Sequence, residues 1–137
     1  MKIIDGTNLV YGRLSAIVAK QLLSGEEIVI VNAKNVAVTG SREFVIRKFR
    51  ERLDIGSVRK GPYYPRTSNQ ILRRSIGDML PKKKTTGKEA LARCKVYSSV
   101  PKEFQGKEMS TIEEVRNSKV SGFVTLGEVA ERLGGKY

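Results

Sequence analysis

Histidine is missing from this chain of 137 residues, and cysteine occurs only once, as Cys94. Histidine is the side chain that most often acts as a general base near neutral pH and as a metal ligand. A lone cysteine can form neither an internal disulfide nor a zinc site of the usual cysteine and histidine kind. The sequence therefore predicts a protein that is not an enzyme, with no catalytic residues, no metal ligands and no cofactor.

Long apolar segments are also missing. No run approaches the roughly 20 residues that a transmembrane helix needs, and the first five residues, Met1 to Asp5, have the pattern of a strand rather than a signal peptide. We expect no contact with a membrane. The single cysteine favours a reducing compartment, so we expect the protein in the cytoplasm. The length suits one domain over residues 1–137.

Acidic residues are scarce in one part of the chain. The whole chain has 26 basic and 14 acidic residues, a net charge of +12. Residues 42–95 contain 16 of the basic and 5 of the acidic ones, a net charge of +11. The rest is nearly balanced, including the segment 101–137. A cationic segment of this kind predicts a polyanionic partner, because each neutralised phosphate releases counterions.

Apolar periodicity predicts an alternation of strands and helices. This alternation favours an α/β sandwich with a mostly parallel sheet. Ser41 and Thr125 are expected to cap the helices that follow them, and capping boxes are expected at Thr67 with Gln70 and at Thr86 with Glu89. The expected strands are 2–5, 27–31, 36–38 and 95–97, and residues 122–124 are expected to be extended. The expected helices are 10–23, 42–53, 67–79, 86–94 and 125–133. Met79, at the end of the third helix, is expected to face inward.

Basic side chains lie away from the apolar stripe of the expected helix 42–53. The loop that follows, residues 55–66, places two tyrosines among cations, a mixture that suits RNA because tyrosine stacks on unpaired bases while cations hold phosphates. Two plainer readings remain open, a solvated helix face and tyrosines that only pack the loop onto the domain. The candidate RNA-binding residues are Arg42, Arg47, Lys48, Arg50, Arg52, Arg59, Lys60, Tyr63, Tyr64, Arg66, Arg73, Arg74, Lys82, Lys83, Lys84, Lys88, Arg93 and Lys95.

Nucleotide binding has little support in the sequence. The turn from Gly6 to Gly12 follows a strand and precedes a helix, where phosphate loops occur. It lacks both the Gly-x-Gly-x-x-Gly spacing and the Gly-Lys-Ser/Thr ending. We therefore predict no small-molecule substrate, although a nucleotide-using enzyme built on this turn and a free RNA-binding regulator both remain as alternatives.

Five stretches, in order along residues 4–97, resemble the universal large-subunit ribosomal protein family conventionally numbered thirteen. The segment Gly61 to Ser68 is similar to the archaeal and eukaryotic branch of that family. The five stretches are Ile4-Asp5-Gly6 with Gly12-Arg13-Leu14, Ile28 to Ala33, Val36 to Gly40, Met79 to Lys82, and Gly87 to Leu91 running to Lys95-Val96-Tyr97.

This resemblance implies a three-layer α/β/α sandwich with a four-stranded, mainly parallel sheet and long basic loops. It also implies a structural constituent of the large ribosomal subunit that binds large-subunit rRNA and supports early subunit assembly. The expected partners are that rRNA and neighbouring large-subunit ribosomal proteins. The basic segment 42–95 corresponds to the rRNA-facing region of the family, and the charge distribution points to the same segment independently.

Overall fold

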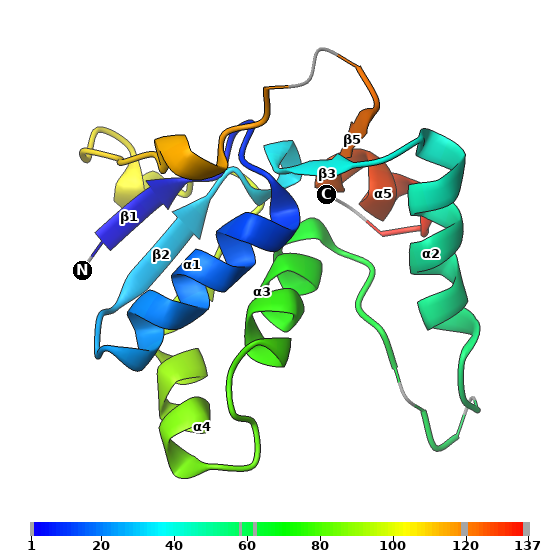
Figure 1. Cartoon of the computed structure of the whole chain (residues 1–137), viewed down its shortest axis with the longest axis horizontal. Helices are drawn as coiled ribbons and strands as arrows, with labels where there is room; N and C mark the ends of the chain where they lie inside the picture. Colours follow the sequence, from blue (N-terminus) through cyan, green and yellow to red (C-terminus); the bar gives the residue numbers. More distant parts are fainter. Residues whose placement is uncertain (1, 58, 62, 119–120, 136–137) are drawn as a thin grey trace.

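The computed structural model describes residues 2–57, 59–61, 63–118 and 121–135. Helices and short strands alternate in the first part of this range, and two 3-10 turns and a final strand and helix complete it (Figure 1). The elements are β1 (Lys2–Asp5), α1 (Tyr11–Leu23), β2 (Ile28–Val31), η1 (Ala33–Asn35), β3 (Ala37–Thr39), α2 (Arg42–Asp54), α3 (Ser68–Asp78), α4 (Thr85–Ala92), β4 (Cys94–Val96), η2 (Lys102–Phe104), η3 (Glu113–Val115), β5 (Phe123–Thr125) and α5 (Leu126–Arg132).

The central sheet has three parallel strands in the order β1-β2-β4. All four residues of β2 are buried, as expected for a strand covered on both faces. Parallel neighbours require crossover connections, which are right-handed in nearly all proteins. Because the strand order advances in one direction, both crossovers place their helices on the same face of the sheet.

The packing of the core agrees with that argument. Ile4, Ile28 and Ile30 point to the face that α1 and α3 cover, and they join one large apolar cluster with Leu14 of α1 and Ile71 of α3. In Figure 1 α1 runs across the sheet, with α3 and α4 beside it. The α/β class is therefore confirmed, with helices on one face of the parallel sheet.

The opposite face of the sheet differs from the expected α/β/α layering. Ile3, Val29 and Val31 point to this face and pack against Phe104. The segment that covers them follows β4 and contains the 3-10 turn η2 rather than an α-helix. The crossover helices lie on the other face, so in the described part of the chain this face is covered by the segment after β4 and not by an α-helical layer.

The expected four-stranded sheet is not confirmed. The strand predicted at 36–38 is β3, and it pairs with β5 in a separate antiparallel ribbon. Asn32 adopts a left-handed conformation (φ 57°) directly after β2, and the turn η1 follows it. The chain therefore leaves the plane of the sheet before β3 begins, and β3 forms an isolated bridge to Val10, just before α1, instead of pairing with a strand of the central sheet in the described residues.

Three local expectations are wrong. Met79 is 45% exposed, because α3 ends at Asp78 and Met79 is the first residue beyond it. Thr86 does not cap α4, which already begins at Thr85 after Lys84. Thr67 precedes α3, but its side chain makes no capping hydrogen bond.

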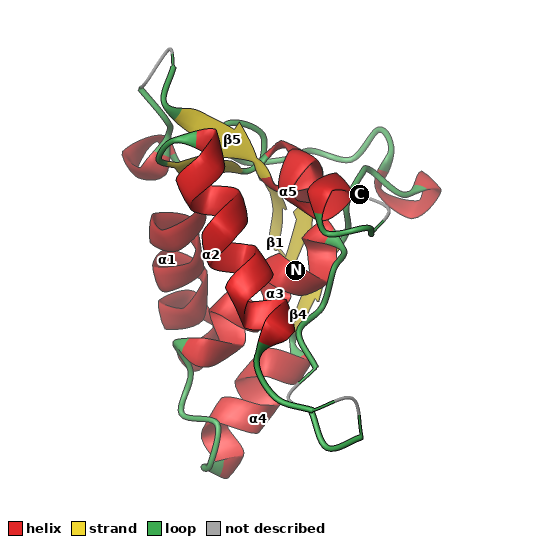
Figure 2. Cartoon of the chain, turned by 90° about the vertical axis from the view of Figure 1, so that its right-hand side faces the viewer, coloured by secondary structure: helices red, strands yellow, loops and turns green. Residues whose placement is uncertain are grey.

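Two capping predictions are confirmed. The Ser41 hydroxyl accepts a hydrogen bond from the amide of Phe44, at the start of α2. The Thr125 hydroxyl accepts one from the amide of Glu128, at the start of α5. Since α5 contacts both α2 and α3, the nearly neutral C-terminal segment supports the basic one (Figure 2).

Candidate RNA-binding surface

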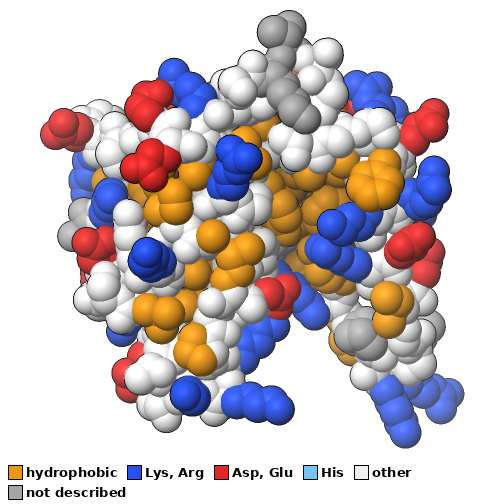
Figure 3. Space-filling view, in the orientation of Figure 1, with side chains coloured by type: hydrophobic (Ala, Val, Ile, Leu, Met, Phe, Trp, Pro, Cys, Tyr) orange, Lys and Arg blue, Asp and Glu red, His pale blue; other side chains and the backbone are white. Residues whose placement is uncertain are grey.

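Two projections extend from the domain in the same direction (Figures 1 and 2). One projection consists of the end of α2 and the loop after it. The other consists of the end of α3, α4 and the turn between them, residues 81–84, which we call the lysine turn. The space-filling view shows a notch between them, with Lys and Arg side chains along both sides (Figure 3). Both projections lie within the basic segment 42–95 that the charge distribution indicated.

Helix α2 buries one face and exposes its cations. Val45 and Phe49 are buried, whereas Arg47, Lys48 and Arg50 are exposed. Arg50 donates a hydrogen bond to the Arg132 carbonyl at 2.9 Å. Arg42, at the first turn of α2, forms a 2.8 Å ion pair with Glu128 of α5. The cations in the middle of α2 are thus presented to solvent, and those nearer its two ends also attach α2 to the C-terminal segment.

A tight hairpin forms the tip of this projection. The backbone amides and carbonyls of Ser57 and Gly61 exchange hydrogen bonds at 2.9 and 3.1 Å, and Gly61 has a φ of +70°. The Ser57 hydroxyl also accepts a hydrogen bond from the amide of Lys60. Arg59 and Lys60 are both exposed. The hairpin therefore carries two exposed cations at the end of this projection.

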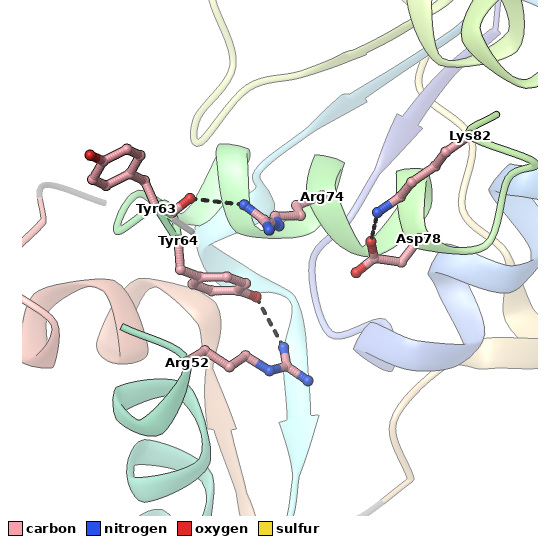
Figure 4. Close-up of polar contacts among 6 residues, drawn as sticks. All are labelled: Arg52, Tyr63, Tyr64, Arg74, Asp78 and Lys82. Atoms are coloured by element: carbon pink, nitrogen blue, oxygen red, sulfur yellow. Dashed lines mark hydrogen bonds and ion pairs between the residues drawn. The ribbon is translucent and has the colours of Figure 1, made fainter. Parts of the chain in front are cut away.

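Tyr64 connects the two projections (Figure 4). Its hydroxyl accepts a 3.0 Å hydrogen bond from Arg52 of α2. The guanidinium carbons of Arg52 and Arg74 lie 5.5 and 5.1 Å from the centre of its ring, within the range of cation–π attraction. Arg52 also lies 5.2 Å from the ring of Phe49, and Arg74 donates a 2.9 Å hydrogen bond to the Tyr63 carbonyl. Loop, α2 and α3 are thus joined around one aromatic ring.

The two tyrosines differ in their surroundings. Tyr64 is half-buried, and its ring is occupied by arginine and phenylalanine neighbours, so it packs the loop as the plainer reading held. Tyr63 is 64% exposed, and in Figure 4 its ring points away from the cluster. Stacking on an RNA base stays a prediction for Tyr63.

Three adjoining hollows surround Tyr64, which lines each of them. The first, of about 410 Å³, is also lined by Gln70, Arg73, Arg74, Lys82 and Leu91. The second, of about 270 Å³, lies between Arg52, Arg74 and Asp78. The third, of about 370 Å³, runs along the loop to Arg66. Together they form a groove, which we call the Tyr64 groove.

The second projection carries Lys82, Lys83 and Lys84 in the lysine turn. Lys83, Lys84 and Lys88 are exposed around the start of α4. Lys82 forms an ion pair with Asp78, four residues earlier. The turn is closely packed, because a Cβ on Gly87 would lie 2.1 Å from the Pro81 carbonyl oxygen.

Other cations of the segment point to the interior. Arg73 donates to the carbonyls of Cys94 and Leu91 at 3.4 and 3.2 Å, and Arg93 donates to the Leu22 carbonyl at 2.6 Å. Arg73 therefore satisfies an acceptor on the edge strand β4, and Arg93 satisfies one in the last turn of α1. Lys95 is exposed on β4, outside the groove.

Sequence reasoning missed the lining residues Gln70 and Asp78. They stand four residues before and after Arg74, a spacing that places all three on one face of α3. This spacing of four residues around Arg74 could have identified Gln70 and Asp78 as its neighbours from the sequence.

The Gly6 to Gly12 turn is occupied by the protein's own carboxylate. Asp5 accepts hydrogen bonds from the Thr7 amide and hydroxyl and from Asn32 at 2.7 to 3.0 Å. Although burial opposes ionisation, these hydrogen bonds lower the pKa of Asp5, so the negative charge persists at neutral pH. A carboxylate at this turn disfavours a bound phosphate there.

Clusters of metal ligands and membrane-spanning helices are both absent from the described residues. Among them no group of three or more acidic or cysteine side chains has the geometry to hold a metal ion. None of the helices in that range is long and apolar enough to cross a membrane.

Comparison with known proteins identifies close relatives. The family model for ribosomal protein L13 matches residues 1–103. The large ribosomal subunit protein uL13 of Thermoplasma volcanium is 63% identical over 135 residues, covering 98% of this chain and 99% of that one. The proteins of the same name from Picrophilus torridus and Methanosarcina barkeri are 58% and 44% identical, and the alignments cover at least 97% of each chain. These organisms are archaea, which agrees with the expected likeness to the archaeal and eukaryotic branch.

Proposed function

The chain belongs to the ribosomal protein L13 family, and from this premise we propose that it is a structural constituent of the large ribosomal subunit that binds large-subunit rRNA and supports early subunit assembly. Members of this family are structural components and not enzymes. The relatives carry the name of the large subunit over nearly the full length of the alignment.

The observation that carries rRNA binding is the placement of the cations. Residues 42–95 hold 16 of the 26 basic side chains, and exposed ones occupy both projections beside the Tyr64 groove. Phosphates of an RNA backbone running between the projections would meet cations on both sides. We assign this role to Arg47, Lys48, Arg50, Arg59, Lys60, Arg66, Arg74, Lys83, Lys84 and Lys88, with Tyr63 positioned to stack on an unpaired base.

Some of the candidate cations already interact with other groups of the protein. Arg73 and Arg93 donate to part-buried backbone carbonyls, whereas Arg50 and Arg74 donate to exposed ones. Arg42 and Lys82 are engaged in ion pairs. An ion pair on an exposed surface stabilises by at most about 1 kcal/mol, so a phosphate can displace it. Arginines that bond to buried carbonyls have less freedom to turn toward RNA.

We further propose that the protein recognises the shape of the rRNA more than its base sequence. A-form helices hide the base edges of their major groove, and the exposed groups here are mostly donors suited to phosphates. The nearly neutral segment 101–137 would then contact neighbouring ribosomal proteins.

The test is fractionation of a native lysate on a sucrose gradient at about 0.5 M salt, a concentration that screens weak electrostatic attachment. We expect the chain to sediment with the large subunit. If it stays at the top of the gradient, the ribosomal proposal fails, and a free RNA-binding regulator becomes the better account.

A further inference from the structure

Arg52 and Arg74 face the same hollow of the Tyr64 groove without an acidic partner. Both line the 270 Å³ hollow together with Tyr64 and Asp78. Within the described part of the chain, no carboxylate oxygen lies within 4.0 Å of either guanidinium group, since the ion pairs found there involve Arg42, Lys82 and Arg116. The acidic side chain that lines this hollow, Asp78, is already paired with Lys82.

Aromatic rings hold these two guanidinium groups in place. Arg52 lies over Phe49 and Tyr64, and Arg74 lies over Tyr64. Each also makes a hydrogen bond through Nη1, Arg52 to the Tyr64 hydroxyl and Arg74 to the Tyr63 carbonyl. A guanidinium group has five N–H donors, so most donors of both groups are left for a ligand.

Arg52 remains protonated in this environment. Burial alone would lower the pKa of Arg52, but its hydrogen bond to Tyr64 raises it above the ordinary value. Both positive charges line the same hollow, so an anion bound there would be attracted by each of them.

We propose that the hollow between Arg52 and Arg74 is a binding site for one phosphate group of the RNA backbone, which both guanidinium groups contact. This inference rests on the proposed rRNA binding and names one subsite of it. The planar fork of arginine matches two phosphate oxygens at once, whereas lysine offers a single compact charge. The adjoining hollows on either side of Tyr64 leave room for the neighbouring nucleotides of a chain.

A subsite made of fixed arginines has a distinct mutational signature. Replacing them with lysine keeps the charge and so keeps the salt dependence of binding, but it removes the fork and its contact with the rings. Exposed cations elsewhere on the projection act through charge alone, and lysine should serve there as well as arginine. The two kinds of contact can therefore be distinguished without altering the net charge.

The experiment measures binding to large-subunit rRNA from the same organism at several salt concentrations, for the wild type, the double variant R52K/R74K and the control R13K/R132K, which changes two exposed arginines outside the basic segment. We expect R52K/R74K to bind about tenfold more weakly with an unchanged salt slope, and the control to stay within about twofold of the wild type. If both double variants bind equally, the subsite proposal is overturned while rRNA binding stands. If the wild type itself does not bind, the proposed function fails.

A second measurement on the wild type guards against misfolding of the variant. The Nε–H NMR signals of Arg52 and Arg74 should shift when the rRNA fragment is added, and the signal of Arg47 should shift less. Inorganic phosphate at the same concentration of phosphate groups should leave them nearly unchanged, because it lacks the neighbouring contacts. Equal shifts with inorganic phosphate, or no shift with RNA, would overturn the proposal.

Discussion

The sheet side and the groove side of this molecule use arginine in opposite ways. On the sheet side, Arg93 donates to the Leu22 carbonyl of α1, and Arg73, which also borders the groove, donates to carbonyls of β4 and α4. On the groove side, Arg52 and Arg74 rest on aromatic rings, and although Arg74 also donates to the exposed Tyr63 carbonyl, both keep most of their donors for other groups. All four belong to the same basic segment.

The difference shows that net charge indicates a binding segment but does not identify the binding side chains. A guanidinium group whose donors meet carbonyls at the end of a helix or the edge of a sheet stabilises the fold. One that meets a π face is oriented but remains available. The predictions below test that division, beginning with the largest expected loss of stability.

Gly87→Ala should disrupt the close packing of α4 against Pro81 in the second projection. The added Cβ would lie 2.1 Å from the Pro81 carbonyl oxygen, so the lysine turn would have to move. We expect the free energy of unfolding to fall by about 3 kcal/mol, measured by urea denaturation.

Gly12→Ala is the matched control for that change. Gly12 is an exposed position in α1, and a Cβ there would meet no atom within 4 Å. Alanine favours a helix over glycine, so stability should rise by about 0.5 to 1 kcal/mol. Equal losses in both variants would contradict the close contact at Pro81.

Arg93→Met should weaken the fold and leave the salt dependence of RNA binding unchanged. The Leu22 carbonyl would lose a hydrogen bond from a charged donor, which costs about 2 kcal/mol. Arg74→Met has the same net charge and should show the reverse. Its hydrogen bond to the Tyr63 carbonyl is exposed, where water can replace it, so stability should change little while the salt slope falls by about 0.7 to 0.9.

A decrease of the salt slope in Arg93→Met comparable to that in Arg74→Met would show that the carbonyl-bonded arginine also contacts RNA. The sequence-based assignment of Arg93 to the RNA surface would then be confirmed. Urea denaturation and filter binding on the same preparations measure both quantities.

Cys94 gives the smallest effect, and it appears only at high pH. Burial raises the pKa of this thiol to about 11 from an ordinary 9.0. Between these values the unfolded chain loses the proton and the folded one keeps it, so stability falls as the pH rises. At pH 10 the loss should be about 1 kcal/mol.

Cys94→Ala removes the titrating group and should lack this component of the pH dependence. The measurement is the urea midpoint at pH 8 and pH 10 for both proteins. An identical change in the two would mean that the thiol is not shielded within the sheet.

The scaffold was largely predictable from the sequence, because its elements are determined by local patterns. The buried strand β2 and the caps at Ser41 and Thr125 follow from neighbouring residues alone. The arrangement of helices on the two faces of the sheet could not be predicted in this way, because it depends on the strand order, which no local pattern encodes. The partner of β3 lies more than 80 residues later, in β5.

The candidate surface was predictable as a segment and less so as a set of side chains. Counting charge placed the cations between residues 42 and 95. Whether a cation meets a carbonyl, a carboxylate or a ring depends on tertiary contacts such as that between Arg93 and Leu22, 71 residues apart. The different surroundings of Tyr63 and Tyr64, which are neighbours in the sequence, arise in the same way.

The most direct test of the account compares two variants of equal net charge. In one, Lys82, Lys83 and Lys84 become glutamine, and in the other, the exposed scaffold lysines Lys20, Lys102 and Lys107 do. For binding to large-subunit rRNA we predict that the first change lowers the salt slope by up to roughly 2 to 3, at about 0.7 to 0.9 per lost phosphate contact, and that the second leaves it unchanged. Equal slopes in the two variants would contradict a binding surface located in the basic segment.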